Sequence, residues 1–177
     1  MTAWLRLSIL VLLAAALPGR AADLRDPVDH FFHAFLGDLR AEVAEAARTK
    51  RKGVVVMYHF DECPACTRMK KQVLNRPAVQ DWYRREFVVI GIDMRGAQPV
   101  TGLDGRTMEE RAYAKAVEIR GSPTFDFYAP DGTRIYRHVG GIYEPDDFLA
   151  LGEFVASGAS RTQTFAEYRQ KSPGKPR

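Results

Sequence analysis

The sequence contains little cysteine, with two residues, Cys63 and Cys66, in a chain of 177. Two thiols are too few for a framework of several disulfides. A structural zinc ion normally takes four ligands, and beyond His59 no obvious fourth ligand lies nearby. A disulfide-rich scaffold and a structural zinc site are therefore disfavoured. Redox chemistry, a single disulfide and the handling of a metal ion stay open.

The body of the chain also lacks an excess of charge of one sign. The formal net charge of +4 comes from the two ends, since Arg6 and Arg20 lie in the first 21 residues and three basic residues lie in the last seven. Without these, acidic and basic residues are nearly equal in number. A nucleic-acid groove needs positive charge clustered on the folded body. We therefore expect no nucleic-acid partner.

Long apolar runs are absent except at the N-terminus, where Leu7–Leu17 follows the basic Arg6. As a helix this run spans about 16 Å, far less than the roughly 30 Å hydrocarbon layer of a bilayer. The small residues Gly19 and Ala21 suit the positions before a signal-peptidase cut. We expect residues 1–21 to be a cleaved signal peptide and the mature protein to be exported, without stable membrane insertion. An uncleaved anchor is the alternative.

Export places the two cysteines in an oxidising compartment, where a disulfide persists. They form the sequence Cys63-Pro64-Ala65-Cys66, and a bridge across so small a loop stabilises a fold less than a long-range one does. Spacing and compartment therefore favour redox chemistry over a purely structural disulfide. Metal handling remains the third possibility.

The cysteine pair lies at a predicted junction between a strand and a helix. Residues 53–60 form a continuous β-prone run, typical of a strand buried on both faces. Asp61 and Glu62 interrupt the run, and Pro64 suits the first position of a helix. Cys63 thus stands at a helix N-terminus, where backbone N–H groups and the helix dipole favour the nucleophilic thiolate.

The rest of the chain can be placed coarsely. Apolar residues at helical spacing after Asp26-Pro27 predict one N-terminal helix, and Thr107 with Glu110 has the pattern of a capping box at the start of another. No periodicity appears over 94–106, which suggests a small hairpin or a functional loop. The other expected elements are a helix from 77, a strand over 87–93 parallel to the first, a hairpin of strands 124–128 and 134–139, and a last helix from 145.

These elements divide the chain into four parts. Residues 1–21 are the signal peptide, 22–52 an N-terminal helical extension, 53–158 the main domain and 159–177 a C-terminal tail. We expect the basic, proline-bearing end of the tail to be disordered.

Three segments in this order resemble the thioredoxin family. They are Cys63-Pro64-Ala65-Cys66, the string Gly121-Ser122-Pro123-Thr124 at the start of a strand, and Gly140 after the last strand. The likeness covers roughly 54–155. It is closer to exported bacterial thioredoxin-like proteins, including those that accompany sulfur-oxidation systems. The resemblance implies an α/β thioredoxin-like fold, with a central mixed β-sheet flanked by helices and an extra N-terminal helix.

The resemblance also implies roles for individual residues. Cys63 would attack a substrate disulfide, and Cys66 would resolve the mixed disulfide. Pro123 would be cis and would place the backbone of Ser122 against the active site, where it can pair with an extended substrate. Gly140 would keep the surface beside that groove open.

The departures from cytosolic thioredoxins bear on proton transfer. Met57 stands where those proteins bury an acid, Val89 where the neighbouring strand carries a lysine, and Glu62 where a tryptophan precedes the first cysteine. Water or Glu62 is then left to assist Cys66. His59 is either a packed strand residue or a proton-relaying neighbour of the thiols.

Three functions compete. We expect a thiol–disulfide oxidoreductase that reduces disulfide-bearing exported proteins in the periplasm, is recharged by a membrane electron donor and needs no cofactor. An oxidant or isomerase is the alternative in the same class, and Pro64 and Ala65 between the cysteines help to set the direction. A copper(I) chaperone that uses Cys63, Cys66 and His59 is the alternative in a different class.

Overall fold

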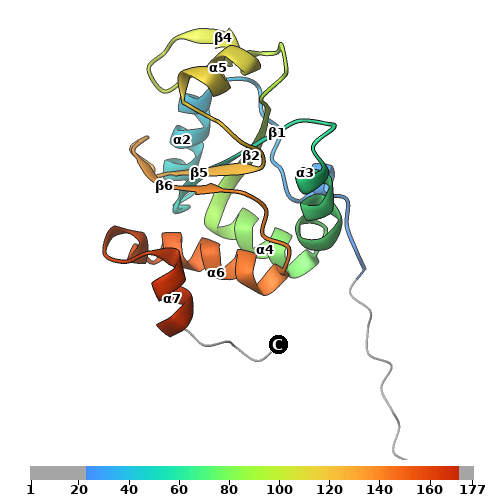
Figure 1. Ribbon diagram of the computed structural model, residues 1–177. Coiled ribbons are helices and arrows are strands. Elements are labelled where there is room, and N and C mark those ends of the chain that lie inside the picture. Colours follow the sequence, from blue (N-terminus) through green and yellow to red (C-terminus); the bar gives the residue numbers. More distant parts are fainter. Residues whose placement is uncertain (1–22, 172–177) are drawn as a thin grey trace, which may run out of the picture.

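The computed structural model describes residues 23–171 and has a four-stranded mixed sheet at its centre (Figure 1). The strands lie in the order β2-β1-β5-β6. β1 (Gly53–His59) runs parallel to β2 (Phe87–Asp93) and antiparallel to β5 (Thr124–Tyr128), and β5 pairs antiparallel with β6 (Arg134–Val139). The expected fold class, an α/β fold around a mixed sheet, is confirmed.

Helices cover both faces of the sheet (Figure 1). The face that holds both cysteines is packed against α3 (Pro64–Met69), the π-helical turn η1 (Lys70–Leu74), α4 (Pro77–Glu86) and α6 (Pro145–Ala156). The opposite face is packed against α2 (Leu39–Arg48), α5 (Glu110–Ala116) and the hairpin of β3 (Pro99–Thr101) and β4 (Thr107–Glu109). Because both faces of β1 are covered, the strand is apolar along almost its whole length, as a doubly buried strand requires.

The N-terminal extension forms two helices, α1 (Pro27–His30) and α2, so the prediction of a single helix was wrong. Between them Gly37 has a φ of +90°, and a Cβ there would lie 2.6 Å from the carbonyl oxygen of Pro99. Asp38 then caps α2. Leu36, one of the apolar residues whose helical spacing suggested a single helix, is 95% exposed. The close backbone approach at Gly37 interrupts a pattern that spacing alone makes look continuous.

The capping box predicted at Thr107 does not form. Thr107 belongs to β4, where its hydroxyl lies 2.8 Å from that of Thr101, so the segment over 94–106 leads into a hairpin. Glu110 is the first residue of α5, and its carboxylate accepts the Asp93 N–H at 3.0 Å. The glutamate therefore serves the end of β2 and not the start of its own helix.

The segment expected to be a tail contains further structure as far as Lys171. A 3-10 turn, η2 (Ala159–Arg161), precedes α7 (Phe165–Lys171). The rings of Phe165 and Tyr168 pack on Phe154 of α6, with centroids 5.5 and 5.2 Å away. The expected signal peptide and the last six residues of the tail lie outside the described residues. Within 23–171, no helix is long and apolar enough to cross a bilayer.

His33 covers the outer edge of β2. Its backbone N–H donates to the Val89 carbonyl oxygen at 2.7 Å, and the Val89 N–H donates to the imidazole Nδ1 at 3.0 Å. Burial, together with the nearby Arg84 guanidinium, lowers the pKa of His33 to about 4 from its ordinary value of 6.5. A proton on Nδ1 would remove the acceptor that holds this edge.

We expect the protein to lose stability as the pH falls from 6.5 to about 4. In this window the unfolded chain binds more protons than the folded one, because the folded pKa is the lower, so the free energy of unfolding rises with pH. His33→Asn keeps an acceptor near the position of Nδ1 but does not titrate. In this pH window the variant should therefore take up about one proton fewer than the wild type on unfolding. Urea unfolding as a function of pH measures this slope. His30→Asn, at an exposed histidine of α1, is the control. An unchanged slope in His33→Asn would contradict the assignment.

Candidate active site

Cys63 and Cys66 lie at the junction between β1 and α3. Cys63 is the N-cap of α3, Pro64 is its first residue, and the Cys66 N–H donates to the Cys63 Sγ at 3.2 Å. The two cysteines form a disulfide, with their Cα atoms 5.3 Å apart. Pro64 is exposed and Ala65 half-buried, whereas only 3% of Cys63 and 1% of Cys66 is exposed. The predicted strand-to-helix junction is confirmed. The backbone donor at Cys63 marks it as the sulfur on which negative charge would be stabilised.

Ser122 approaches both sulfur atoms from the start of β5. Its peptide bond to Pro123 is cis, as predicted. The Ser122 carbonyl oxygen lies 3.7 Å from the Cys63 Sγ. The Ser122 Oγ lies 3.0 Å from the Cys66 Sγ and 3.3 Å from the carbonyl oxygen of Tyr58, to which it can donate. Backbone and side chain of one residue thus contact the two cysteines separately.

Gly140 completes the surface beside Pro123. Its N–H donates to the Pro123 carbonyl oxygen at 2.8 Å. It has a φ of +104°, and an added Cβ would meet no atom within 4 Å. The structure therefore gathers the two cysteines, Ser122, Pro123 and Gly140 in one place, with open space at the glycine.

None of the three positions that the sequence analysis linked to proton transfer supplies a polar group to Cys66. Met57 is fully buried in the same core cluster as the cysteines and pairs with Gly91, while Val89 lies opposite Val55. The Glu62 side chain is 78% exposed and forms an ion pair with Arg95 at 3.3 Å. The polar group at the Cys66 sulfur is the Ser122 hydroxyl. Sequence reasoning assigned Ser122 a backbone role only, although a hydroxyl before the expected cis-proline was a visible signal.

His59 is a packed strand residue. Its ring lies against that of Phe32, with centroids 6.2 Å apart. Burial, helped by the charge of Lys70, lowers the pKa of His59 to about 4, which leaves the imidazole neutral. Among residues 23–171, no hydrogen bond joins this side chain to a cysteine, and no group of three or more potential metal-ligating side chains is gathered. Within the described residues, His59 therefore has no direct hydrogen-bonded path to either sulfur.

Two arginines brace the segments before and after the disulfide. The Arg95 guanidinium lies 3.7 Å from the ring centroid of Phe60 and also pairs with Glu62. On the other side, the Arg68 guanidinium of α3 lies 4.0 Å from the ring centroid of Tyr143. Such contacts combine a cation–π attraction with the packing of the arginine stem. Sequence reasoning did not find these pairs, because their partners are distant in the chain.

Residues 39–156 match the family of thioredoxin-like domains. The chain belongs to this family. A search of curated protein sequences finds no relative of significant similarity. A thioredoxin-like domain that carries its Cys-x-x-Cys pair as a disulfide is consistent with thiol–disulfide exchange.

Solved structures share the thioredoxin-like fold at low sequence identity. A thioredoxin-fold protein from Helicobacter pylori has a TM-score of 0.55 and 20% identity, over 67% of this chain and 78% of that one. A putative disulphide-isomerase from Bacteroides thetaiotaomicron has a TM-score of 0.51 and 25% identity, over 75% and 97%. A thioredoxin from Thermus thermophilus has a TM-score of 0.51 and 23% identity, over 70% and 88%.

We expect Ser122→Ala to make the Cys66 thiolate harder to form. A hydrogen bond to a charged group is worth about 1.5–3 kcal/mol, so the midpoint of thiolate formation should rise by about one pH unit or more. The ultraviolet absorbance of the thiolate, followed in a Cys63→Ala background, measures this midpoint. Ser122→Thr keeps the hydroxyl and should stay close to the parent. Equal midpoints for Ser122→Ala and the parent would show that the hydroxyl does not act on Cys66.

Proposed function

We propose that this thioredoxin-like protein is an exported thiol–disulfide oxidoreductase that reduces disulfides of other exported proteins in the periplasm. The observation that carries the proposal is the Cys63–Cys66 disulfide at the start of α3, lying against the cis Ser122–Pro123 segment. The backbone donor at the Cys63 Sγ suits a nucleophile, and the open surface at Gly140 suits a protein substrate. The Cys63-Pro64-Ala65-Cys66 and Gly121-Ser122-Pro123-Thr124 segments, which resemble those of exported thioredoxin-like proteins, favour the same assignment.

The reaction uses the two sulfur atoms in turn. The Cys63 thiolate attacks one sulfur of the substrate disulfide, a Cys63–substrate bond forms, and the other substrate sulfur leaves as a thiolate. Cys66, deprotonated beside the Ser122 hydroxyl, then attacks the Cys63 Sγ. This step releases the second substrate sulfur and leaves the Cys63–Cys66 disulfide. Two electrons have passed to the substrate, so a dithiol donor must reduce the pair again, and we assign this role to a membrane electron donor.

The direction of the reaction depends on the reduction potential of the pair. The Bacteroides structure described as a putative disulphide-isomerase supports an isomerase as the alternative. Equilibration of Cys63–Cys66 with glutathione measures the potential. A reduction potential of about −270 mV, as in reducing thioredoxins, supports the proposal, whereas a potential of about −120 mV would identify an oxidant.

A copper(I) chaperone remains the competing function in a different class. Its two sulfur ligands are joined here as a disulfide and would have to be reduced first, and the proposed third ligand, His59, packs against Phe32. Anaerobic copper(I) titration beside an insulin-reduction assay separates the two functions. Stoichiometric copper binding without insulin reduction would favour the chaperone.

We expect Cys66→Ala to accumulate a mixed disulfide between Cys63 and its substrate, because the resolving thiol is missing. Insulin reduction should fall close to the uncatalysed rate. Non-reducing electrophoresis and mass spectrometry of the trapped species measure the first effect. Cys63→Ala is the matched control and should trap nothing. A substrate trapped on Cys66 in that control would reverse the roles of the two cysteines.

Export rests on the N-terminal sequence, which lies outside the described residues. We expect the mature protein to begin at Ala22 or within about two residues of it. N-terminal sequencing of protein from the periplasmic fraction tests this position. Ala21→Phe places a bulky ring at the cut and should leave the leader attached. Met1 at the N-terminus of exported wild-type protein would contradict cleavage.

A further inference from the structure

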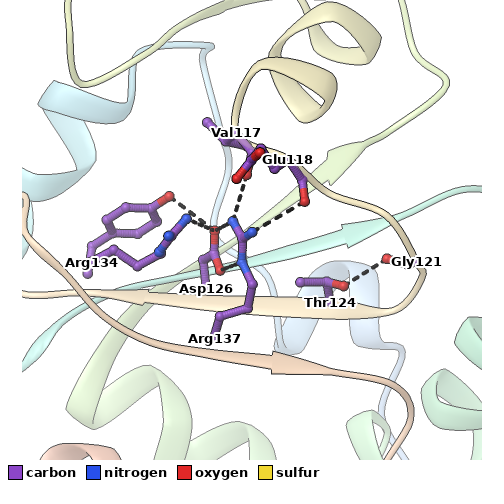
Figure 2. A network of polar contacts seen from close by, with 8 residues as sticks. Val117, Glu118, Gly121, Thr124, Asp126, Arg134 and Arg137 are labelled. Atoms are coloured by element: carbon purple, nitrogen blue, oxygen red, sulfur yellow. Dashed lines mark hydrogen bonds and ion pairs between the residues drawn. The ribbon is translucent and has the colours of Figure 1, made fainter. Parts of the chain in front are cut away.

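A buried ion pair joins β5 to β6 on the sheet face opposite the disulfide. Asp126 is fully buried and lies directly across from Arg137 in the strand register. The Arg137 Nε and Nη2 donate to the two carboxylate oxygens of Asp126, each at 2.6 Å. Tyr128 also donates to the carboxylate at 3.2 Å, and the Arg134 guanidinium lies 3.9 Å from it (Figure 2).

Arg137 also reaches beyond the sheet to the end of α5. Its Nη2 donates to the Val117 carbonyl oxygen at 2.9 Å, and its Nη1 donates to that of Glu118 at 3.4 Å (Figure 2). Val117 is the C-cap of α5, and Glu118 has a left-handed φ of +60°. Carbonyls at a helix C-terminus have no partner within the helix. The arginine supplies partners at the point where the chain turns out of α5.

A second contact fixes the far end of the same segment. The Thr124 hydroxyl donates to the Gly121 carbonyl oxygen at 2.7 Å. Residues 117–121 are thus tied to the sheet at both ends (Figure 2). The next residue is Ser122, whose carbonyl and hydroxyl groups contact the two cysteines.

We infer that Asp126 and Arg137 are positioning residues, which hold segment 117–121 so that Ser122–Pro123 presents a fixed edge to the protein substrate. This inference rests on the proposed function. The planar guanidinium binds the carboxylate along one edge and still has N–H groups for two carbonyls, which the single ammonium of lysine cannot match. An apolar pair could join β5 to β6, but it could not hold the carbonyls.

The test compares reaction with a protein disulfide and with a small one. Reduced, thiol-titrated protein is mixed in stopped flow with insulin or with dithiobis(nitrobenzoate), and the second-order rates are compared. Only insulin needs an aligned Ser122–Pro123 edge, because the small reagent meets Cys63 directly. Arg137→Lys should lower the insulin rate about tenfold, since small displacements of a positioning segment are costly, and should change the small-disulfide rate by less than about twofold.

Arg134→Lys is the matched control, since Arg134 approaches Asp126 but makes no hydrogen bond to the segment among the described residues. It should leave the ratio of the two rates unchanged. Thr124→Val supplies a second variant without touching a charge, in case Arg137→Lys does not fold. It should lower the insulin rate about threefold by freeing Gly121, and Thr124→Ser should restore it.

Each outcome decides the inference. An Arg137→Lys protein with an unchanged ratio, or a folded Thr124→Val protein with an unchanged ratio, would overturn it. An equal change in Arg134→Lys would also overturn it, because the effect would then not depend on the hydrogen bonds from Arg137 to the segment. Wild-type protein that reacts with the small disulfide but leaves insulin intact would instead remove the proposed function, and the inference with it.

Discussion

The pairing of β1 with β5 is the constraint on which the rest of the site depends. The register sets Tyr58 opposite Thr124, so Ser122 and Pro123 lie beside the chain that leaves β1 for α3. Cys63 and Ser122 meet across 59 residues of sequence because of this one antiparallel pairing. A slip of one residue would turn Met57 to the other face of the sheet. The hydrophobic core and the active site are therefore specified by the same hydrogen bonds.

The polar group that contacts the buried Cys66 sulfur, the Ser122 hydroxyl, carries no charge. An acid in place of Met57 would lie in the same core cluster as Val55, Val89 and Phe125, all fully buried, and a charge without a partner is costly in such a place. A hydroxyl avoids this cost, because its single proton can be donated to the Tyr58 carbonyl while the sulfur is neutral and to the sulfur when the thiolate forms. The Ser122 hydroxyl can therefore hydrogen-bond to the Cys66 sulfur without placing a charged side chain in this apolar core.

The sequence predicts this fold best where one local property determines the structure. The apolar run of β1 and the proline before the first turn of α3 needed no distant partner, and both were predicted correctly. The prediction of a single N-terminal helix was wrong because the break at Gly37 depends on the Pro99 carbonyl, which belongs to a distant hairpin. The prediction of a capping box was wrong for the same reason, since the Glu110 carboxylate accepts a hydrogen bond from the end of β2.

The same distinction applies to the active site. The spacing of Cys63 and Cys66 identifies the redox pair, and the family resemblance points to Ser122 and Pro123. The contact between the Ser122 hydroxyl and Cys66 depends on the β1–β5 register. Spacing along the chain does not reveal this register. Partners that are distant in sequence, such as Arg95 with Phe60, were hidden for the same reason.

β5 shows how one short strand serves two layers of the molecule. Phe125 and Phe127 belong to the core that holds the cysteines, and the alternate residues face the opposite layer. Alternation places Asp126 on the layer opposite the cysteines, where its carboxylate is completely buried. A buried carboxylate needs a cation, and the register supplies Arg137 directly opposite. Because that guanidinium also binds the carbonyls at the end of α5, the burial of one charge ties the sheet to the segment that delivers Ser122.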